Sequence, residues 1–463
     1  MTFRKSGRSS VTGEQKMAYD PLSASGPGTG LDHPPSYWAA TAGPEPEDDG
    51  PLNGDHETDI AIIGGGYTGL STAYHIARDL GAKPVVLEAN RCGWGCSGRN
   101  GGFVRPALGR LDHGKWIENW GLDGARELFA ECLSAVELTR AIIDIGKINC
   151  DMQLAGGLEL AHLASRCEGL KAKQKLLEER FDFETEFVDA EFLAVRHFRG
   201  QEAFAALREQ TSFGLHPLKL AYGLHRLARR AGAVVHGASP VTAWHKDGDK
   251  HVLQTPGGRL RADQVVIATN GYSTERLLKP VRARTLPVLS SIIVTRPMTA
   301  KEKADCNLLT SHVMIDTRRL RPYFRRLPDD RIMLGGRGSL GDAPDQQARQ
   351  KDALLRIVKR KFPALHDITV DYFWGGWVNI SYDFMPHIHR CEEDRSVLYA
   401  MGYCGAGVAQ AILAGKRLAE NMGGNETTVP PPLRTALPRY PLPAFRRLGQ
   451  WAMVNWYRCR DSR

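Results

Sequence analysis

The chain has 463 residues, of which 42% are hydrophobic and 24% are charged. That length exceeds the usual ceiling for a single hydrophobic core, so the sequence predicts an ordinary globular protein with two packed domains. The formal charge of +9 reflects basic residues that crowd the two ends of the chain, and since no nucleic-acid motif accompanies them, nucleic acid is not expected as a partner.

The cysteines and the apolar segments indicate the compartment. Nine cysteines are scattered without a CxxC pair or a histidine at metal-ligand spacing, which predicts reduced thiols and no metal site. No apolar run approaches the ~20 residues that span a bilayer, and the N-terminus lacks the apolar core of a signal peptide. We therefore expect a cytoplasmic protein.

Residues 1–50 are rich in Ser, Gly, Pro and charged residues, which predicts a mobile N-terminal arm. One apolar patch, Tyr37-Trp38-Ala39, interrupts this composition. We expect the patch to lie against the body of the protein.

The next segment predicts a strand over residues 59–63 and a helix over residues 67–80, joined by a glycine turn. Gly64 permits the tight turn, Gly66 lets a phosphate approach the backbone, and Gly69 allows the helix to pack closely on the strand. The helix N-terminus supplies unpaired N–H donors and about half a positive charge, which suit a diphosphate. The spacing therefore predicts a dinucleotide site.

A second apolar strand, over residues 84–87, strengthens this prediction. It ends at Glu88, about 20 residues past the glycines, where a carboxylate can accept hydrogen bonds from ribose hydroxyls. A glycine turn in some other βαβ unit is the alternative, but strands on both sides and the terminal acid favour a dinucleotide.

The middle of the chain alternates helix and strand signals. We expect helices over residues 124–145, 169–179 and 216–230, and strands over residues 233–236, 252–255 and 264–269. The last of these strands looks buried and ends in Asn270-Gly271, so we expect it to return to the parallel sheet.

Residues 292–336 alternate with the period of antiparallel strands. The pattern is clearest at residues 323–326 and 332–334, on either side of a turn that begins at Pro328. We assign this segment to a substrate domain.

A last strand, turn and helix follow. Residues 398–401 predict a buried strand, residues 402–407 a glycine turn, and a helix then continues to Met422. This unit closes the cofactor domain, which is therefore discontinuous.

Seven segments occur together in an order that resembles one protein family. They are residues 62–69, 93–102, 215–219, 268–272, 323–325, 374–376 and 402–407. The pattern resembles the FAD-dependent amine and amino-acid oxidases of the D-amino-acid oxidase superfamily, and within it the γ-glutamylputrescine oxidases. The resemblance covers nearly everything from Ser36 to the C-terminus.

The resemblance implies an α/β fold in which a discontinuous FAD-binding domain, Rossmann-like and of the glutathione-reductase type, joins an α+β substrate domain built on an antiparallel sheet. The FAD-binding domain would comprise residues 57–115, 205–275 and 370–430, and the substrate domain residues 116–204 and 276–369. Residues 1–50 would be the arm and residues 431–463 a C-terminal tail.

The resemblance also implies which residues hold FAD. Ser97, Arg99 and Asn100 would lie beside the flavin ring and the pyrophosphate, and Val241 would meet the adenine through its backbone. A helix starting near Val408 would direct its positive end toward the flavin ring, which becomes anionic on reduction. The full set is Gly64, Gly66, Tyr67, Thr68, Glu88, Ala89, Ser97, Arg99, Asn100, Gly101, Gly102, Val241, Thr269, Asn270, Gly405, Gly407, Val408 and Ala409.

Two departures from the family pattern concern the flavin linkage. Where many relatives read Ser-Gly-His-Gly, this chain reads Cys404-Gly405-Ala406-Gly407, and we expect Cys404 to be a packed thiol. Relatives that tether the flavin use a cysteine in the segment matching residues 376–382 or a histidine near Arg99, and this chain has neither. FAD is therefore expected to bind noncovalently.

Tyr323 and Arg325 are the candidate substrate-contacting residues. They are two positions apart on a predicted strand and so share a face, whereas Arg326 points the other way. In the superfamily an arginine at about this position pairs with a substrate carboxylate, which the guanidinium fork matches. The alternatives are a surface or interdomain ion pair for Arg325 and a packing role for Tyr323.

The segment from Trp374 to His389 offers a further hypothesis. Trp374 and Trp377 could form an aromatic wall beside the flavin, and Asp383 could hold the distal cation of a polyamine. The alternative is an aromatic core followed by a turn aspartate.

The C-terminal tail carries a basic, aromatic helix over residues 445–457, with Phe445, Leu448, Ala452 and Trp456 at helical spacing. Such a helix could lie on a membrane surface. Similar tails occur in soluble relatives, so we expect it to dock on the body of the protein and do not expect membrane contact.

These expectations describe an FAD-dependent oxidase of an amine or amino acid. A hydride passes from carbon to the flavin, the imine hydrolyses, and molecular oxygen accepts the electrons and becomes peroxide. The favoured substrate is a γ-glutamylated di- or polyamine. One alternative is a dehydrogenase that passes electrons to a quinone or another carrier, and a second is a flavin-stabilised scaffold without turnover.

Overall fold

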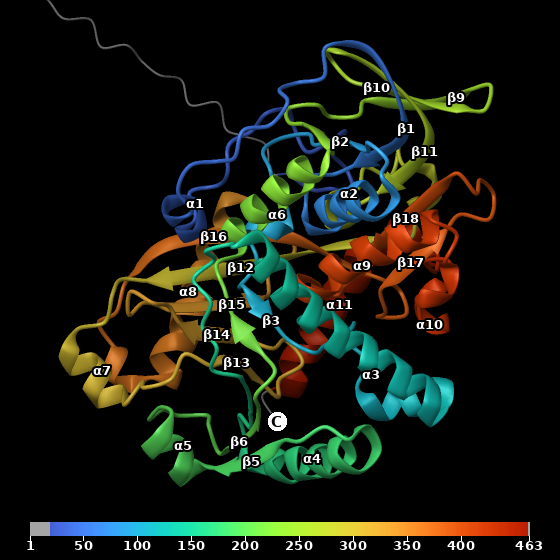
Figure 1. The fold of residues 1–463 in the computed structure, drawn as a ribbon. Helices are drawn as coiled ribbons and strands as arrows, with labels where there is room; N and C mark the ends of the chain where they lie inside the picture. Colours follow the sequence, from blue (N-terminus) through green and yellow to red (C-terminus); the bar gives the residue numbers. More distant parts are fainter. Residues whose placement is uncertain (1–18, 462–463) are drawn as a thin grey trace, which may run out of the picture.

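The computed structural model describes residues 19–461, so the first eighteen residues of the expected arm lie outside the described part. The described residues form two eight-stranded sheets and one two-stranded sheet, with helices packed around them (Figure 1). None of the helices in this part of the chain combines the length and the hydropathy that crossing a bilayer requires.

The first sheet contains the strands expected to bind a dinucleotide, at the top of Figure 1. Its strands are β1 (Gly54–Ile63), β2 (Val85–Leu87), β8 (Val234–His236), β9 (Ala243–Asp247), β10 (Lys250–Gln254), β11 (Gly258–Ile267), β17 (His387–Arg390) and β18 (Val397–Met401). They follow the order β17-β18-β11-β1-β2-β8, with β10 and β9 joined to β11. β11 pairs in parallel with β1, which confirms that this strand returns to the parallel sheet.

The second sheet lies below the first in Figure 1 and is antiparallel except where β4 runs parallel to β13. Its strands are β4 (Gly157–Leu160), β5 (Glu186–Asp189), β6 (Ala205–Glu209), β12 (Leu286–Thr295), β13 (Val313–Asp316), β14 (Tyr323–Arg326), β15 (Ile332–Arg337) and β16 (Val370–Ile380). Their order is β16-β12-β15-β14-β13-β4-β6-β5. A separate ribbon pairs β3 (Phe103–Val104) with β7 (Phe213–Gly214).

The helices cover both sheets. They are α1 (Tyr37–Thr41), α2 (Tyr67–Leu80), α3 (His113–Gly146), α4 (Cys167–Phe181), α5 (Ala190–Arg196), α6 (Pro217–Ala231), α7 (Ala300–Cys306), α8 (Pro344–Lys361), α9 (Gly407–Met422), α10 (Pro431–Arg434) and α11 (Arg446–Asp461). α2 and α9 pack so closely that a Cβ on Gly415 would lie 2.5 Å from the Cβ of Ser71. The Ser71 hydroxyl also donates to the carbonyl of Ile412 at 2.6 Å.

Several sequence predictions are confirmed residue by residue. α2 covers residues 67–80, β14 covers residues 323–326, and α9 ends at Met422, as the patterns indicate. α3 is longer than expected, because it begins at His113 and continues through a break at Gly121, where φ is 71°.

Sheet membership differs from the expected domain boundaries at two strands. β6 and β16 were both expected in the cofactor domain, but both pair within the second sheet. β16 belongs to the second sheet because it pairs antiparallel with β12 along its whole length, from Val370 to Ile380. The division of the chain into two domains stays a prediction.

The apolar patch of the N-terminal segment lies against the body, as predicted. Trp38 is 1% exposed, and its indole N–H donates to the carbonyl of Asn100 at 2.9 Å. Two further contacts hold the described part of the arm against the body: Asn90 Nδ2 donates to Pro27 O at 3.1 Å, and Asp20 pairs with Arg447.

Candidate active site

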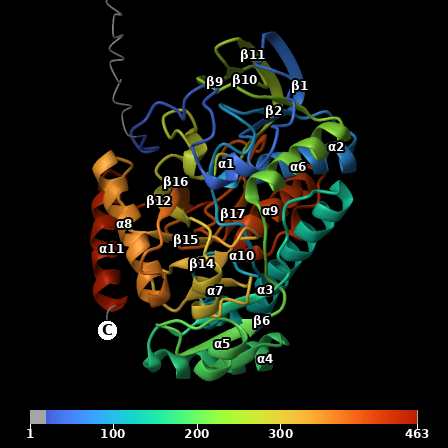
Figure 2. The ribbon, with the colours of Figure 1, turned by 90° about the vertical axis from the view of Figure 1, so that its left-hand side faces the viewer.

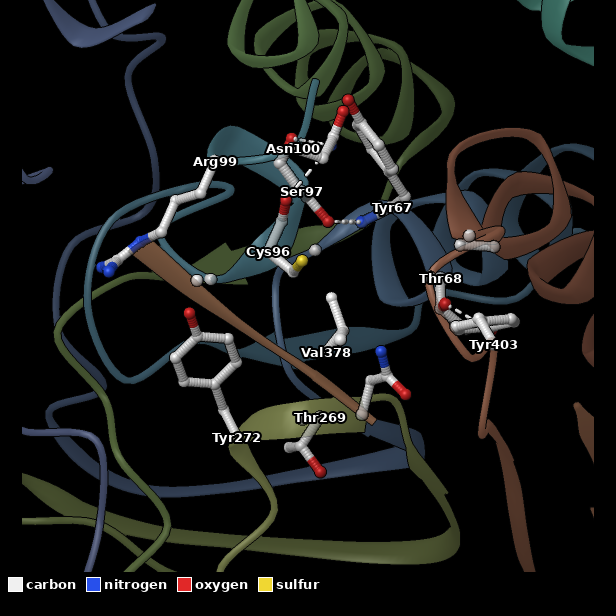
Figure 3. A pocket seen from close by; sticks show the side chains of 18 of the residues that line it. Tyr67, Thr68, Cys96, Ser97, Arg99, Asn100, Thr269, Tyr272, Val378 and Tyr403 are labelled. Atoms are coloured by element: carbon white, nitrogen blue, oxygen red, sulfur yellow. Dashed lines mark hydrogen bonds between the residues drawn. The ribbon is translucent and has the colours of Figure 1, made fainter. Parts of the chain in front are cut away.

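A cavity of about 350 Å³ lies where the carboxyl ends of β1, β2 and β11 approach the second sheet. Of the residues expected to hold the cofactor, only Gly102 is absent from its lining. The fold therefore brings predicted residues from six separated segments of the chain to one site. Figure 3 shows this cavity with ten of its side chains labelled.

The glycine turn is a backbone wall that tolerates no side chains. Gly64 has φ +110°, and a Cβ there would lie 3.0 Å from the carbonyl oxygen of Ala268. A Cβ on Gly69 would lie 1.9 Å from Gly64 O, and a Cβ on Gly66 2.9 Å from Ser97 Oγ. Tyr67 and Thr68 of the first turn of α2 line the cavity, so the N-terminus of this helix faces it.

Glu88 stands at the end of β2 with both carboxylate oxygens engaged. Oε2 accepts from the amide of Gly65 at 2.6 Å, and Oε1 accepts from the amide of Asn90 at 2.9 Å. Burial raises the pKa of Glu88. The carboxylate is thus held rigidly against the glycine turn, and a hydrogen bond to ribose stays a prediction.

The loop after β2 is tied to the start of α2. Ser97 Oγ accepts from the amide of Tyr67 at 2.9 Å, a contact drawn in Figure 3. Asn100 closes the loop on itself, because its Nδ2 donates to Ser97 O at 2.9 Å and its Oδ1 accepts from Gly102 N at 2.7 Å. Arg99 Nε donates to Trp94 O at 2.7 Å, and its guanidinium stacks over the Trp94 ring.

The turn between β18 and α9 forms the facing wall. Tyr403 and Thr68 share a hydroxyl hydrogen bond of 2.7 Å, and Gly402 N donates to Asn270 Oδ1 at 3.2 Å. Cys404 is a buried free thiol whose pKa burial raises to about 11, which confirms its expected packing role. The positive end of α9 therefore faces the cavity beside Gly405.

Tyr323 lines the cavity, but Arg325 does not. The Arg325 side chain is 1% exposed and donates to Gly101 O at 3.3 Å, Leu215 O at 2.5 Å and Gln153 Oε1 at 2.5 Å. Burial lowers its pKa to about 10, so the guanidinium stays charged at neutral pH. Tyr323 and Arg325 do share a face of β14, yet the longer side chain continues behind the cavity wall.

Gly102 explains why Arg325 fits there. A Cβ on Gly102 would lie 2.0 Å from Leu215 O and 2.9 Å from Arg325 Nη2. Gly214 also leaves space for the guanidinium, since a Cβ at this position would lie 2.8 Å from Arg325 Nη1. We call this meeting point of residues 101–102, 214–215 and Arg325 the Arg325 junction.

Four arginines that the sequence analysis did not single out line the end of the cavity near the second sheet. We call Arg105, Arg110, Arg321 and Arg337 the arginine end. Arg337 Nη2 donates to Cys404 O at 3.0 Å, so its guanidinium lies beside the turn between β18 and α9. No motif marks these residues, because they lie in loops or at a strand end and converge only in the fold.

The arginine end is strongly cationic. Glu88 is the single carboxylate residue among the described lining residues, against five arginines including Arg99. Burial lowers the pKa of Arg105 and of Arg110. Burial would raise the pKa of nearby Glu159, but Lys173 and the charges of Arg321 and Arg105 bring it down to about 2.

Trp374, Trp377 and Asp383 do not line the cavity. Both tryptophans are buried, and the Trp374 indole donates to Arg99 O at 2.8 Å. Asp383 pairs with His387 at 3.0 Å. The structure thus favours the alternative of an aromatic core and a turn aspartate for this segment.

Comparison with known proteins gives a family match over most of the chain. Residues 59–421 match the family model described as "DAO: FAD dependent oxidoreductase". The gamma-glutamylputrescine oxidoreductase of Escherichia coli K12 is 31% identical over 90% of this chain and 95% of its own. The glycine oxidase of Bacillus licheniformis is 24% identical over 79% of this chain and 93% of its own.

Solved structures show the same fold. The glycine oxidase of Geobacillus kaustophilus superposes with a TM-score of 0.69 at 20% identity, over 83% of this chain and 99% of its own. The L-proline dehydrogenase of P. horikoshii superposes with a TM-score of 0.64 at 20% identity, over 84% of this chain and 96% of its own.

Proposed function

The chain belongs to the family of FAD-dependent oxidoreductases that matches residues 59–421, and from that membership we propose that it is an oxidase of an amine or amino acid. FAD would supply the group that accepts a hydride from the carbon of the substrate's C–N bond. Oxygen is the proposed final acceptor of the electrons. We place the reaction in the cytoplasm.

The residues of the cavity fit this cofactor. Gly64, Gly66 and the first turn of α2 would hold the diphosphate, because all of them line the cavity and a helix N-terminus offers backbone N–H donors to an anion. Glu88 and Val241 would hold the adenosine. The flavin ring would lie between residues 97–101 and residues 405–409, with FAD bound noncovalently.

The chain's own contribution to the reaction is positioning and charge. Tyr323 and Phe103, whose rings meet edge to face at 5.6 Å, line the cavity and would exclude water from the reacting carbon. The arginine end would hold a substrate carboxylate through charge-assisted hydrogen bonds. Its positive charge also opposes protonation of a nearby amine, and the neutral amine is the form that can release a hydride.

The observation that carries the substrate proposal is the excess of arginines over carboxylates in the cavity lining. A γ-glutamylated di- or polyamine has an α-carboxylate at its glutamyl end, which the arginine end can bind. A simple polyamine has only cations to offer, and Asp383, which could have met them, is paired with His387 away from the cavity. The identity to the Escherichia coli relative supports the same substrate.

The alternative acceptor defines a second candidate function. The L-proline dehydrogenase that shares the fold carries a dehydrogenase name, so the fold does not select oxygen. In that case the same half-reaction would deliver electrons to a quinone or another carrier.

An anaerobic spectral titration tests both points. The purified flavoprotein would receive γ-glutamylputrescine, putrescine, sarcosine or glycine without oxygen, and the flavin bands would be followed before and after air is admitted. We expect γ-glutamylputrescine to bleach the bands and putrescine to leave them unchanged. Bleaching by putrescine alone would overturn the substrate proposal, and bands that return only with a quinone would identify a dehydrogenase.

A further inference from the structure

Helix α11 lies along the outer edge of the molecule in Figure 2, and large apolar side chains on it and just before it are exposed. Phe445 and Leu448 are each 59% exposed, Trp451 is 53% exposed and Trp456 is 50% exposed. Phe445, Leu448, Ala452 and Trp456 are the stripe that the sequence places on one face, and all four are exposed. The stripe expected to pack on the body is thus the one left uncovered.

The opposite face of α11 holds the helix firmly to the body through polar contacts. Arg446 pairs with Glu275 at 2.5 Å, and Arg447 pairs with Asp20. Gln450 is buried, and Asp461 accepts from the amide of Arg319 at 2.7 Å. The tail therefore docks as expected, but with its polar face, so the outward apolar face belongs to a fixed helix.

The exposed face carries positive charge without free negative charge. Arg458 and Arg460 are exposed at the C-terminal end of α11, although Arg458 Nη2 also donates to Gly338 O at 3.0 Å. The only acidic residue of the helix is Asp461, which is already bound. The guanidinium carbons of Arg319 and Arg460 both lie 5.4 Å from the Trp456 ring centre. Tryptophan beside arginine, on a helix with an apolar stripe, is the pattern of a helix lying in the headgroup region of a membrane.

We propose that α11 seats this protein on the surface of an anionic lipid bilayer. The apolar stripe would enter the boundary between headgroups and acyl chains, while Arg458 and Arg460 would meet lipid phosphates. A second copy of the chain is a poorer occupant. A two-fold contact through this face would bring the arginines of both helices together with no carboxylate between them.

Binding to vesicles of stated composition tests the proposal on the full-length flavoprotein. The protein would be floated with vesicles of pure phosphatidylcholine and with vesicles that also contain phosphatidylglycerol, at low and at high salt. We expect flotation with the anionic vesicles at low salt, weaker flotation at high salt and a blue shift of tryptophan emission on binding. Absence of flotation with anionic vesicles, or equal flotation with both kinds, would overturn the proposal.

Substitutions on α11 make the test specific. Leu448→Ser with Trp456→Ser removes apolar area at exposed positions and should weaken vesicle binding by about a hundredfold. Arg458→Gln and Arg460→Gln should each weaken it by about fivefold. The matched control pairs Leu309→Ser with Phe204→Ser, two exposed apolar residues far from α11 in sequence, and should bind as the unaltered protein does.

The control and the oligomeric state complete the test. Flavin content and the unfolding midpoint should be unchanged in every variant, because each altered side chain is exposed. Equal loss of binding in the control pair would overturn the assignment to α11. A dimer in solution that the α11 double variant dissociates would assign this face to a second copy instead.

Discussion

The two ends of the cavity are built in different ways. At the glycine turn, backbone atoms form the surface and close contacts exclude side chains, as the 1.9 Å approach at Gly69 shows. At the arginine end, long charged side chains from a loop, a turn and a strand end form the surface. A surface made of backbone follows from local spacing in the sequence, whereas one made of converging side chains depends on the whole fold.

The largest expected effect tests the backbone end. Gly69→Ala places a Cβ against the carbonyl of Gly64, and because backbone cannot swing aside we expect a loss of more than about 3 kcal/mol of stability together with loss of FAD. Flavin absorbance relative to protein and a urea midpoint would measure both.

The matched control is Gly169→Ala in α4, where a Cβ meets nothing within 4 Å. That change should stabilise the protein by about 0.5–1 kcal/mol, because alanine favours a helix. A Gly69→Ala protein with full flavin content would show that this turn does not need its glycine.

The Arg325 junction lies between the two ends and should respond mainly in stability. Arg325→Met leaves Gly101 O and Leu215 O without their buried donor, so we expect a loss of about 3 kcal/mol in the free energy of unfolding. Arg326→Met is the control, since Arg326 makes a partly exposed pair with Asp330 at 3.5 Å and a long, exposed hydrogen bond to Leu309 O at 3.5 Å, and the change should cost less than about 1 kcal/mol. If Arg325→Met left stability unchanged and raised KM, Arg325 would have the substrate-binding role that the sequence predicts for it.

The arginine end should respond in substrate binding. Arg337→Gln removes one charge beside Gly405, and we expect KM for a carboxylate-bearing amine to rise by about tenfold to a hundredfold with a smaller change in kcat. Arg349→Gln, on the exposed face of α8, removes the same charge and should leave KM unchanged. Equal KM values in both variants and in the unaltered enzyme would show that Arg337 does not bind the substrate.

The smallest effect concerns acid stability. His216 caps α6, and burial lowers its pKa to about 3, well below the unfolded value of about 6.5. The unfolded chain therefore binds the proton first, so this stability is complete above the unfolded pKa and is lost as the pH falls below it. His216→Asn keeps an N-cap acceptor but removes the titrating group. Between about pH 7.5 and about pH 5.5 the variant should therefore lose about 1 kcal/mol less free energy of unfolding than the unaltered protein.

Urea midpoints at the two pH values would measure this difference. Both proteins should lose stability as the pH falls, since burial also lowers the pKa of His75 and of His225, and the unaltered protein should lose about 1 kcal/mol more because it keeps His216. An identical pH dependence for the variant and the unaltered protein would mean that folding does not lower the pKa of His216.

The sequence predicts well where structure is local. The bounds of α2 and β14 follow from periodicity and glycine placement, and nearly the whole cofactor set lines one cavity because its residues lie at the ends of strands and in the turns after them. The alternation of β14 correctly put Tyr323 and Arg325 on one face. It could not show that Gly102 and Gly214 leave a channel through which Arg325 reaches Leu215 O.

Helix α11 shows the same limit at the surface. Its spacing predicts a helix and a stripe, but the inward face is decided by Glu275 and Asp20, which lie far away in sequence. The choice of face therefore could not be read from the periodicity alone.

The Arg325 junction also sets an order of events during synthesis. Arg325 is 224 residues after Gly101 and 110 residues after Leu215 in the chain. A ribosome delivers the glycine turn early, but the loop beside it has no charged partner until Arg325 emerges. The hydrogen bonds of Arg325 to Gly101 O and Leu215 O therefore form only after residue 325 has been synthesised.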